Sequence, residues 1–117
     1  MKPLVIDLFC GLGGWSKGFI SEGWEAWGFD VERHNYGDGG YPGQLVLQDV
    51  LTLHGSQFRK ADLIVASPPC QQYSLWGMRM FHPNPPIPDK RLWEAAIRIA
   101  HQAEKPIIIE NVRGAQY

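Results

Sequence analysis

The sequence predicts an α/β domain built on an open parallel sheet, and three observations lead to this class. Short apolar runs rich in β-branched residues alternate along the chain with segments of helical spacing. The first of these runs breaks into a glycine-rich turn before a helix, which is how a βα unit begins. The run at 61–67 is apolar almost throughout, as in a strand covered on both faces. Such alternation favours parallel strands joined by right-handed crossovers.

Each expected element has its own signal. Gly23 suits the end of the first helix and Asp89 the start of the last, while 52–60 has room for one or two helical turns. The segment 34–43 holds too many glycines for a helix and is expected to be a long loop. Strands are expected at 4–9, 24–30, 44–50, 61–67 and 105–112, and the main helices at 14–21 and 89–104.

The composition is typical of one compact domain, which we expect to cover residues 1–117. Hydrophobic residues make up 44% of the 117 positions and charged residues 20%, which excludes a disordered chain. No apolar run is long enough to cross a membrane and no signal-peptide pattern opens the sequence, so a cytoplasmic location is expected. The net charge of −1 means that nucleic-acid binding would need a local basic patch or a partner.

The two cysteines, Cys10 and Cys70, match neither a disulfide framework nor a zinc-site spacing. Cys70 follows two prolines at the end of an apolar strand, and this rigid backbone suits a nucleophile whose sulfur must be aimed. A buried structural cysteine is the alternative. Glu110 lies at the end of the very apolar last strand. This is an unlikely place for a carboxyl group that is only solvated, so Glu110 favours the catalytic interpretation of Cys70. Nothing near Cys10 aims it at a substrate.

The candidate binding residues all follow strands, at the edge where open parallel sheets bind ligands. The glycine turn DLFCGLGGWS would let the backbone approach a ligand closely, although such turns also serve packing. Asp30 or Glu32 could accept the hydroxyls of a ribose, and Asp49 the amino group of an adenine. Each could instead be a solvated strand end or the start of a turn. Because neither common phosphate-binding glycine pattern is complete, a nucleoside without phosphates fits best.

Five segments in this order, DLFCGLGG, FDVE, LQDV, SPPCQ and IIIENV, resemble the first five blocks of the cytosine-C5 DNA methyltransferase family. The resemblance runs from Ile6 to about Gly114. It implies a Rossmann-like fold, a truncated form of the S-adenosylmethionine-dependent methyltransferase fold, with strand order 3-2-1-4-5. It also implies methyl transfer from S-adenosylmethionine to C5 of cytosine in DNA, leaving S-adenosylhomocysteine.

The resemblance implies a role for each matching residue. Cys70 would attack C6 of a flipped cytosine, Glu110 would hold N3 of that ring, and Asn111 would support the loop. Asp30 would take the ribose hydroxyls and Asp49 the adenine amino group. The residues expected at the cofactor are Phe9, Gly11, Gly13, Gly14, Asp30, Val31, Asp49, Val50 and Pro69.

Two departures from the family pattern keep other interpretations open. Pro68 replaces the usual phenylalanine, and the resulting SPPC is similar to the SPP-aromatic block of exocyclic-amino methyltransferases, although cysteine cannot stack on a base. The later family blocks and the target-recognition domain do not appear among the 117 residues. An inactive cofactor- or partner-binding module is therefore an alternative, and a tRNA cytosine remains a possible substrate. An uncovered last strand also predicts a homodimer or a complementing subunit.

Overall fold

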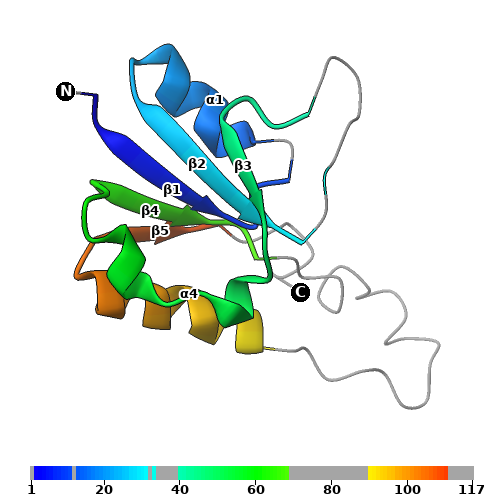
Figure 1. Cartoon of the computed structure of the whole chain (residues 1–117), viewed down its shortest axis with the longest axis vertical. Helices are drawn as coiled ribbons and strands as arrows, with labels where there is room; N and C mark the ends of the chain where they lie inside the picture. Colours follow the sequence, from blue (N-terminus) through cyan, green and yellow to red (C-terminus); the bar gives the residue numbers. More distant parts are fainter. Residues whose placement is uncertain (1, 12, 32, 34–39, 69–89, 111–117) are drawn as a thin grey trace.

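A computed structural model of the chain describes residues 2–11, 13–31, 33, 40–68 and 90–110. Within them, five strands form one sheet in the order β3-β2-β1-β4-β5, and every neighbouring pair is parallel. The predicted class and strand order are confirmed (Figure 1). The elements are β1 Leu4–Leu8, α1 Gly14–Ser21, β2 Glu25–Asp30, β3 Gln44–Leu47, the 3-10 turns η1 Val50–Thr52 and η2 Gly55–Phe58, β4 Leu63–Ala66, α4 Arg91–Ala103 and β5 Ile107–Ile109.

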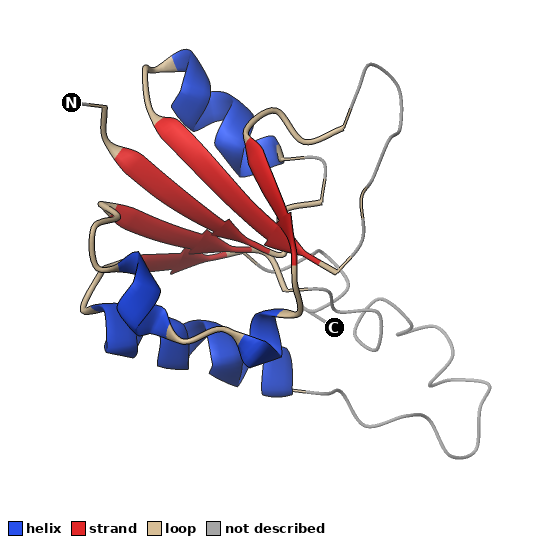
Figure 2. Cartoon of the chain, in the orientation of Figure 1, coloured by secondary structure: helices blue, strands red, loops and turns tan. Residues whose placement is uncertain are grey.

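Helix α1 covers one face of the sheet and α4 covers the other (Figure 2). Under α1, Val5, Ala26 and Val65 from three neighbouring strands form a small buried cluster that packs against Trp15 and Phe19. Each residue of this cluster comes from a different strand because neighbouring parallel strands present side chains of the same register to the same face.

The larger core lies on the α4 face, where Ile64 and Ile99 are fully buried. The segment expected to hold one or two helical turns forms η1 and η2, whose Leu53 and Phe58 join this core. Arg98 of α4 donates a 2.8 Å hydrogen bond to the backbone oxygen of Leu53. These short turns therefore fill the α4 face next to the helix rather than forming a layer of their own.

The helix ends agree in part with the predicted signals. Gly23 has a φ of +88°, and its N–H bonds to the oxygen of Ile20 just after α1 ends, which is the role glycine plays after helices. Helix α4 begins at Arg91 with Lys90 at the N-cap and no side-chain cap. Asp89, the expected cap, lies outside the described residues.

The two edge strands of the described sheet are β3 and β5. On β5, Ile108 keeps 45% of its surface exposed, and Ile97 on the neighbouring helix keeps the same fraction. None of the helices among the described residues combines the length and apolar character needed to span a bilayer.

Candidate functional site

The carboxyl ends of the central strands meet along one edge, which we call the rim. Past β4, the N–H of Ser67 donates to the oxygen of Leu8 at 3.3 Å, and past β5 the N–H of Glu110 donates to the oxygen of Ala66 at 2.9 Å. These bonds continue the sheet ladder by one residue beyond the strands. The glycine turn, the start of SPPC and Glu110 therefore lie on adjacent strands, as the topology predicts.

The turn after β1 has an unusual backbone. Phe9, Gly11 and Gly13 all lie in the left-handed region, with φ of 58°, 51° and 81°. Glycine adopts this region freely, but an aromatic residue there costs roughly 1–2 kcal/mol. The Gly13 N–H donates a 2.7 Å bond to the oxygen of Cys10, which closes the turn. Strain of this kind gathers at binding sites, and the glycine pattern alone did not predict it for Phe9.

Asp30 joins the end of β2 to this turn. Its Oδ2 accepts a 2.9 Å hydrogen bond from the Gly11 N–H, so the carboxylate predicted to meet a ribose lies next to the glycine turn. Val31, the next residue, is 64% exposed. A Cβ placed on Gly11 or on Gly14 would meet nothing within 4 Å. The rim thus offers open space beside the turn, and a nucleoside-type cofactor fits the groups around it.

The two predicted cofactor residues after β3, Asp49 and Val50, each have a structural role in the fold. The Oδ1 of Asp49 accepts a 2.9 Å bond from the Leu51 N–H and so begins η1, which is the turn-starting alternative. Val50 is 2% exposed and belongs to the core on the α4 face. Phe9 also packs partly against that core. A contact between Asp49 and a cofactor would use its Oδ2, because Oδ1 already accepts from Leu51. The Val50 side chain is buried and faces away from solvent.

The segment that leads to Cys70 is held at its first two residues. Trp15, at the start of α1, donates from Nε1 to the Ser67 Oγ at 2.9 Å, and Pro68 is fully buried. Glu110 is exposed at the neighbouring strand end. The predicted residues Glu32, Pro69, Cys70 and Asn111 lie outside the described residues, so the pairing of Cys70 with Glu110 stays a prediction.

Cys10 lies in the turn and is only 6% exposed. Burial, followed by the nearby carboxyl groups of Asp7 and Asp30, raises its pKa to about 12. At neutral pH this thiol is protonated, and the thiolate is the nucleophilic form. The environment of Cys10 therefore suits a structural cysteine.

A buried polar cluster behind the turn was not predicted from the sequence. Asp7 of β1 is 1% exposed and Ser16 of α1 is fully buried. The Ser16 hydroxyl donates to Asp7 Oδ2 at 2.7 Å and lies 2.6 Å from the hydroxyl of Tyr41. Burial raises the pKa of Asp7 to about 7, although the Ser16 bond lowers it and the charge of Asp30 adds to the rise. The sequence signal that could have indicated this cluster is the single carboxyl group inside the apolar run LVIDL.

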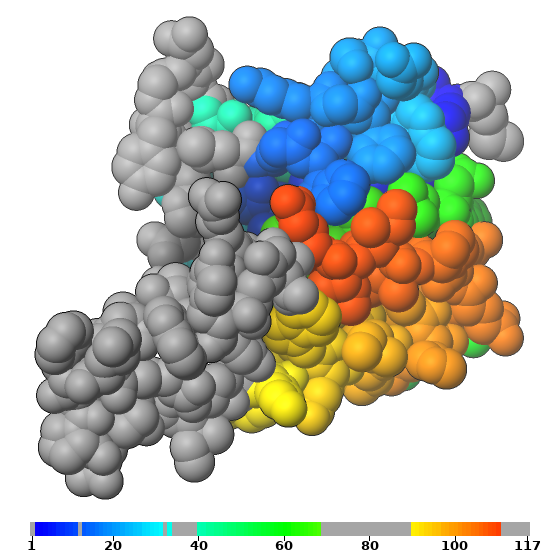
Figure 3. Space-filling model, turned by 180° about the vertical axis from the view of Figure 1, so that it is seen from behind, coloured from blue at the N-terminus to red at the C-terminus, as the bar shows by residue number. Residues whose placement is uncertain are grey.

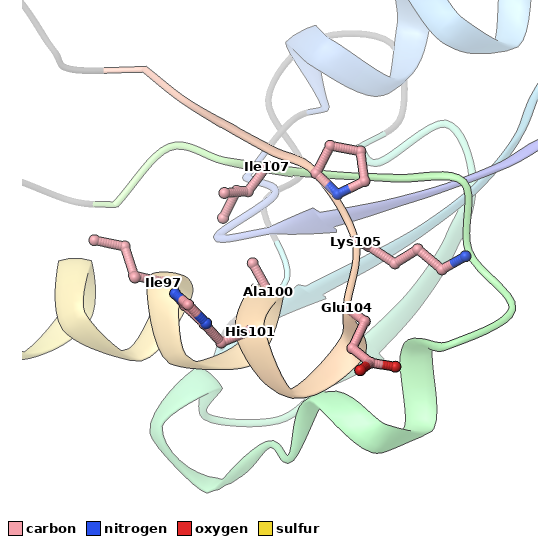
Figure 4. A pocket seen from close by; sticks show the side chains of 7 residues that line it. Ile97, Ala100, His101, Glu104, Lys105 and Ile107 are labelled. Atoms are coloured by element: carbon pink, nitrogen blue, oxygen red, sulfur yellow. The ribbon is translucent and has the colours of Figure 1, made fainter.

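A pocket of about 500 Å³ lies elsewhere, between the second half of α4 and the start of β5 (Figure 4). Ile107 is at the first position of β5, whereas the rim is at the other end of that strand. The described residues contain no cluster of His, Cys, Asp and Glu that could hold a metal ion. The pocket is lined by Ile97, Ala100, His101, Glu104, Lys105, Pro106 and Ile107.

The sheet order, the strained glycine turn and the acidic end of β2 are those of a Rossmann-like methyltransferase fold. The family model of the C-5 cytosine-specific DNA methylases matches residues 4–116. The chain belongs to this family.

Curated relatives agree with this assignment. The type II methyltransferase M1.HphI of Haemophilus parahaemolyticus is 33% identical over 126 residues, covering 96% of this chain and 33% of the relative. The type II methyltransferase M.AplI of Arthrospira platensis is 31% identical over 121 residues, covering 97% and 32%. The type II methylase M.HgiEI of Herpetosiphon aurantiacus is 30% identical over 127 residues, covering 93% and 25%. The chain thus spans a quarter to a third of the length of these relatives.

Proposed function

We propose that this chain is a single catalytic domain that transfers a methyl group from S-adenosylmethionine to C5 of cytosine in DNA, in the cytoplasm. The observation that carries the proposal is the family match over residues 4–116, together with the adjacency of the glycine turn, Ser67 and Glu110 on one rim. The description of the matching family, C-5 cytosine-specific DNA methylase, supports DNA as the substrate, and the relatives are type II methyltransferases.

The described rim supports S-adenosylmethionine as the cofactor. Asp30 would accept the ribose hydroxyls, Phe9 and Val31 would contact the adenine, and Asp49 would accept from its amino group. Gly11 and Gly14 have open space beside them, which leaves room for the methionine part close to the backbone. When bound, this cofactor supplies an electrophilic methyl group on a sulfonium centre.

The protein's own residues would prepare the cytosine to accept that methyl group. The thiolate of Cys70 adds to C6, and the electrons of the C5–C6 double bond move so that C5 becomes nucleophilic. Glu110 holds the proton at N3 and thereby disperses the negative charge that this addition creates. After C5 is methylated, a base removes the C5 proton, the double bond reforms and the Cys70 thiolate leaves. Asn111 would hold the loop that carries Glu110.

Identifying which nucleoside becomes methylated tests this function directly. The chain is incubated with S-adenosylmethionine and either duplex DNA or tRNA, and the digested products are analysed by mass spectrometry. We expect 5-methylcytosine in DNA and its loss in Cys70→Ala. Formation of N4-methylcytosine that survives Cys70→Ala would identify an exocyclic-amino enzyme instead. Binding of S-adenosylhomocysteine with no methylated product in any substrate, even after the complementing fragment described below is added, would identify an inactive binding module.

We further propose that a complementing subunit covers β5 in the active assembly. Figure 3 shows the orange and red surface of this strand lying open between α1 and α4, and Ile97 and Ile108 are each 45% exposed there. Among the described residues no strand pairs with the outer side of β5, and such an edge readily accepts another strand. The relatives are three to four times as long as the matched region. We expect the partner to resemble the part of the relatives that this chain does not match.

Analytical ultracentrifugation tests the partner. A fragment of M1.HphI comprising the residues that this chain does not match should form a one-to-one complex with the chain. Ile108→Lys should weaken that complex, whereas Val31→Lys, at an exposed position on the rim, should leave it intact. A chain that forms a stable dimer with itself and ignores the fragment would contradict the proposal in favour of a homodimer.

A further inference from the structure

Tyr41, in the described segment 40–43 just before β3, places its ring behind the glycine turn. A Cβ on Gly13 would lie 2.8 Å from the ring's Cδ1, and one on Gly28 of β2 would lie 2.5 Å from its Cζ. The ring therefore occupies room that exists because both positions are glycine. Adding a side chain at either position would displace the ring or the backbone around it.

The two sides of the turn are chemically different. Positions 11 and 14 face open space, whereas position 13 faces Tyr41 and Pro42, with the Pro42 Cδ only 2.5 Å from a Cβ built there. Gly13 is buried and Gly14 is exposed. The open side is where the cofactor is proposed to lie, so Tyr41 supports the turn from the opposite, buried side.

The hydroxyl of Tyr41 ends a chain of hydrogen bonds that links three elements. Ser16 has one hydroxyl hydrogen, and it goes to Asp7 Oδ2 at 2.7 Å. The 2.6 Å bond between Ser16 and Tyr41 must then be donated by Tyr41 when Asp7 is a carboxylate. The segment before β3, the first turn of α1 and the end of β1 are tied together in this way. The glycine turn connects β1 to α1, so the bonds tie both ends of the turn to the segment before β3.

This arrangement restrains a turn that would otherwise relax. Phe9 stores strain in the left-handed region, which the two glycines adopt freely. Among the bonds described above, the one from the Gly11 N–H to Asp30 holds the open side of the turn. On the buried side, the ring of Tyr41 limits the position of Gly13, and Ser16 fixes the helix that follows. A turn held on both sides keeps its backbone groups in place for a ligand before the ligand arrives.

We propose that Tyr41 is a positioning residue for S-adenosylmethionine, acting through Ser16 and Gly13 to hold the glycine turn in its binding shape. This inference rests on the proposed cofactor site. The ring supplies packing and the hydroxyl supplies the link to Ser16, so the two contributions can be separated by substitution. Tyr41→Phe keeps the ring between Gly13 and Gly28 and removes only the donated hydrogen bond.

Calorimetric binding of S-adenosylhomocysteine tests the proposal, at a temperature where near-ultraviolet circular dichroism shows every variant folded. We expect Tyr41→Phe and Ser16→Ala each to raise the dissociation constant roughly fivefold to tenfold, the size expected for one hydrogen bond. The double variant should lose little more than either single variant because both remove the same link. Ser21→Ala, which removes an exposed hydroxyl bond to the Gly18 oxygen in the same helix, is the matched control and should bind as the wild type does.

The possible failures are distinguishable. Lower melting temperatures of Tyr41→Phe and Ser16→Ala with wild-type dissociation constants would show a purely structural role and overturn the proposal alone. Additive losses in the double variant would also overturn it, because Tyr41 would then not act through Ser16. A wild-type chain that binds no S-adenosylhomocysteine would overturn the proposed cofactor site and this inference with it.

Discussion

Trp15 and Ser67 join the two loops that the proposed reaction needs. The Nε1 of Trp15, one residue into α1, donates to the Ser67 Oγ at 2.9 Å. Trp15 follows the glycine turn directly, and Ser67 lies three residues before Cys70 in the sequence. One hydrogen bond therefore connects the turn proposed for the cofactor to the segment proposed for the nucleophile.

Removing this bond should slow catalysis more than it weakens cofactor binding. Trp15→Phe keeps an aromatic ring against the α1 cluster but leaves the Ser67 hydroxyl without its donor. A bond worth about 1 kcal/mol predicts a roughly fivefold lower rate of methyl transfer. Trp27→Phe is the matched control, because Trp27 donates a longer, exposed bond of 3.2 Å to Glu25 on β2. Equal losses in both variants would argue against a link through Ser67.

The two glycines at the start of α1 should respond in opposite ways to alanine. At Gly13, φ is +81° and a Cβ would lie 2.5 Å from the Pro42 Cδ, so Gly13→Ala should lower the free energy of unfolding by about 2 kcal/mol or more. At Gly14 the new Cβ meets open space, and alanine suits a helix better than glycine by up to about 1 kcal/mol. Urea unfolding measures both changes.

Gly14→Ala also tests the cofactor side of the turn. Its methyl group enters the space proposed for S-adenosylmethionine, so the folded variant should bind S-adenosylhomocysteine at least roughly tenfold more weakly, a loss of about 1.4 kcal/mol. Wild-type affinity in this stable variant would mean that the cofactor does not lie beside the exposed face of the turn.

Asp7 should make the stability of the chain depend on pH. Burial raises its pKa from 3.8 to about 7, so the folded chain holds this proton more tightly than the unfolded chain does. Stability from this group is fully present below about pH 4 and decreases as the pH rises to about 7, by at most about 4 kcal/mol. Ser16 donates to the carboxyl group, and Asp30, Cys10 and Tyr41 interact with it electrostatically.

Asp7→Asn removes the titration and keeps an acceptor for Ser16. Urea unfolding between pH 4.5 and 8 should therefore show a shallower decline in this variant than in the wild type. Asp62→Asn changes an exposed carboxylate that accepts from the Leu4 N–H and should retain the wild-type decline. If the free energy of unfolding of Asp7→Asn declined with pH as steeply as that of the wild type, Asp7 would not be the group responsible for the decline.

The two cysteines should differ in reactivity. Cys10 is buried with its pKa raised to about 12, whereas Cys70 is proposed to act as a thiolate. Brief treatment of the folded chain with iodoacetamide at pH 7.5 should label Cys70 and spare Cys10, as read by peptide mass spectrometry. Comparable labelling of Cys10 under the same conditions would show that its surroundings in solution are not those of a buried structural thiol.

The sequence predicted the sheet better than it predicted the details of the site. The parallel α/β class follows from apolar runs, glycines and crossover rules, which are local signals combined with general topology. The strand order was implied by the family resemblance, and the structure has that order. The placement of Asp30 beside the glycine turn also follows from topology, since the two are ends of neighbouring parallel strands.

What was missed depends on contacts between distant residues. The burial of Val50 comes from packing of η1 against the α4 face, and LQDV carries no signal for it. The insertion of Tyr41 depends on Gly13 and Gly28, each separated from it by more than ten positions. The left-handed conformation of Phe9 is likewise unfavourable locally. It is observed only where the surrounding turn imposes it.

A covalent trap tests the central claim most directly. The chain, together with the complementing M1.HphI fragment, is incubated with S-adenosylmethionine and a DNA duplex carrying 5-fluorocytosine, whose fluorine cannot leave as a proton does, and the products are separated on a denaturing gel. We predict a protein–DNA adduct that forms with the wild type and with Cys10→Ala and disappears with Cys70→Ala. An adduct that persists in Cys70→Ala, or methylation of ordinary cytosine without any trapped adduct, would contradict nucleophilic attack by Cys70.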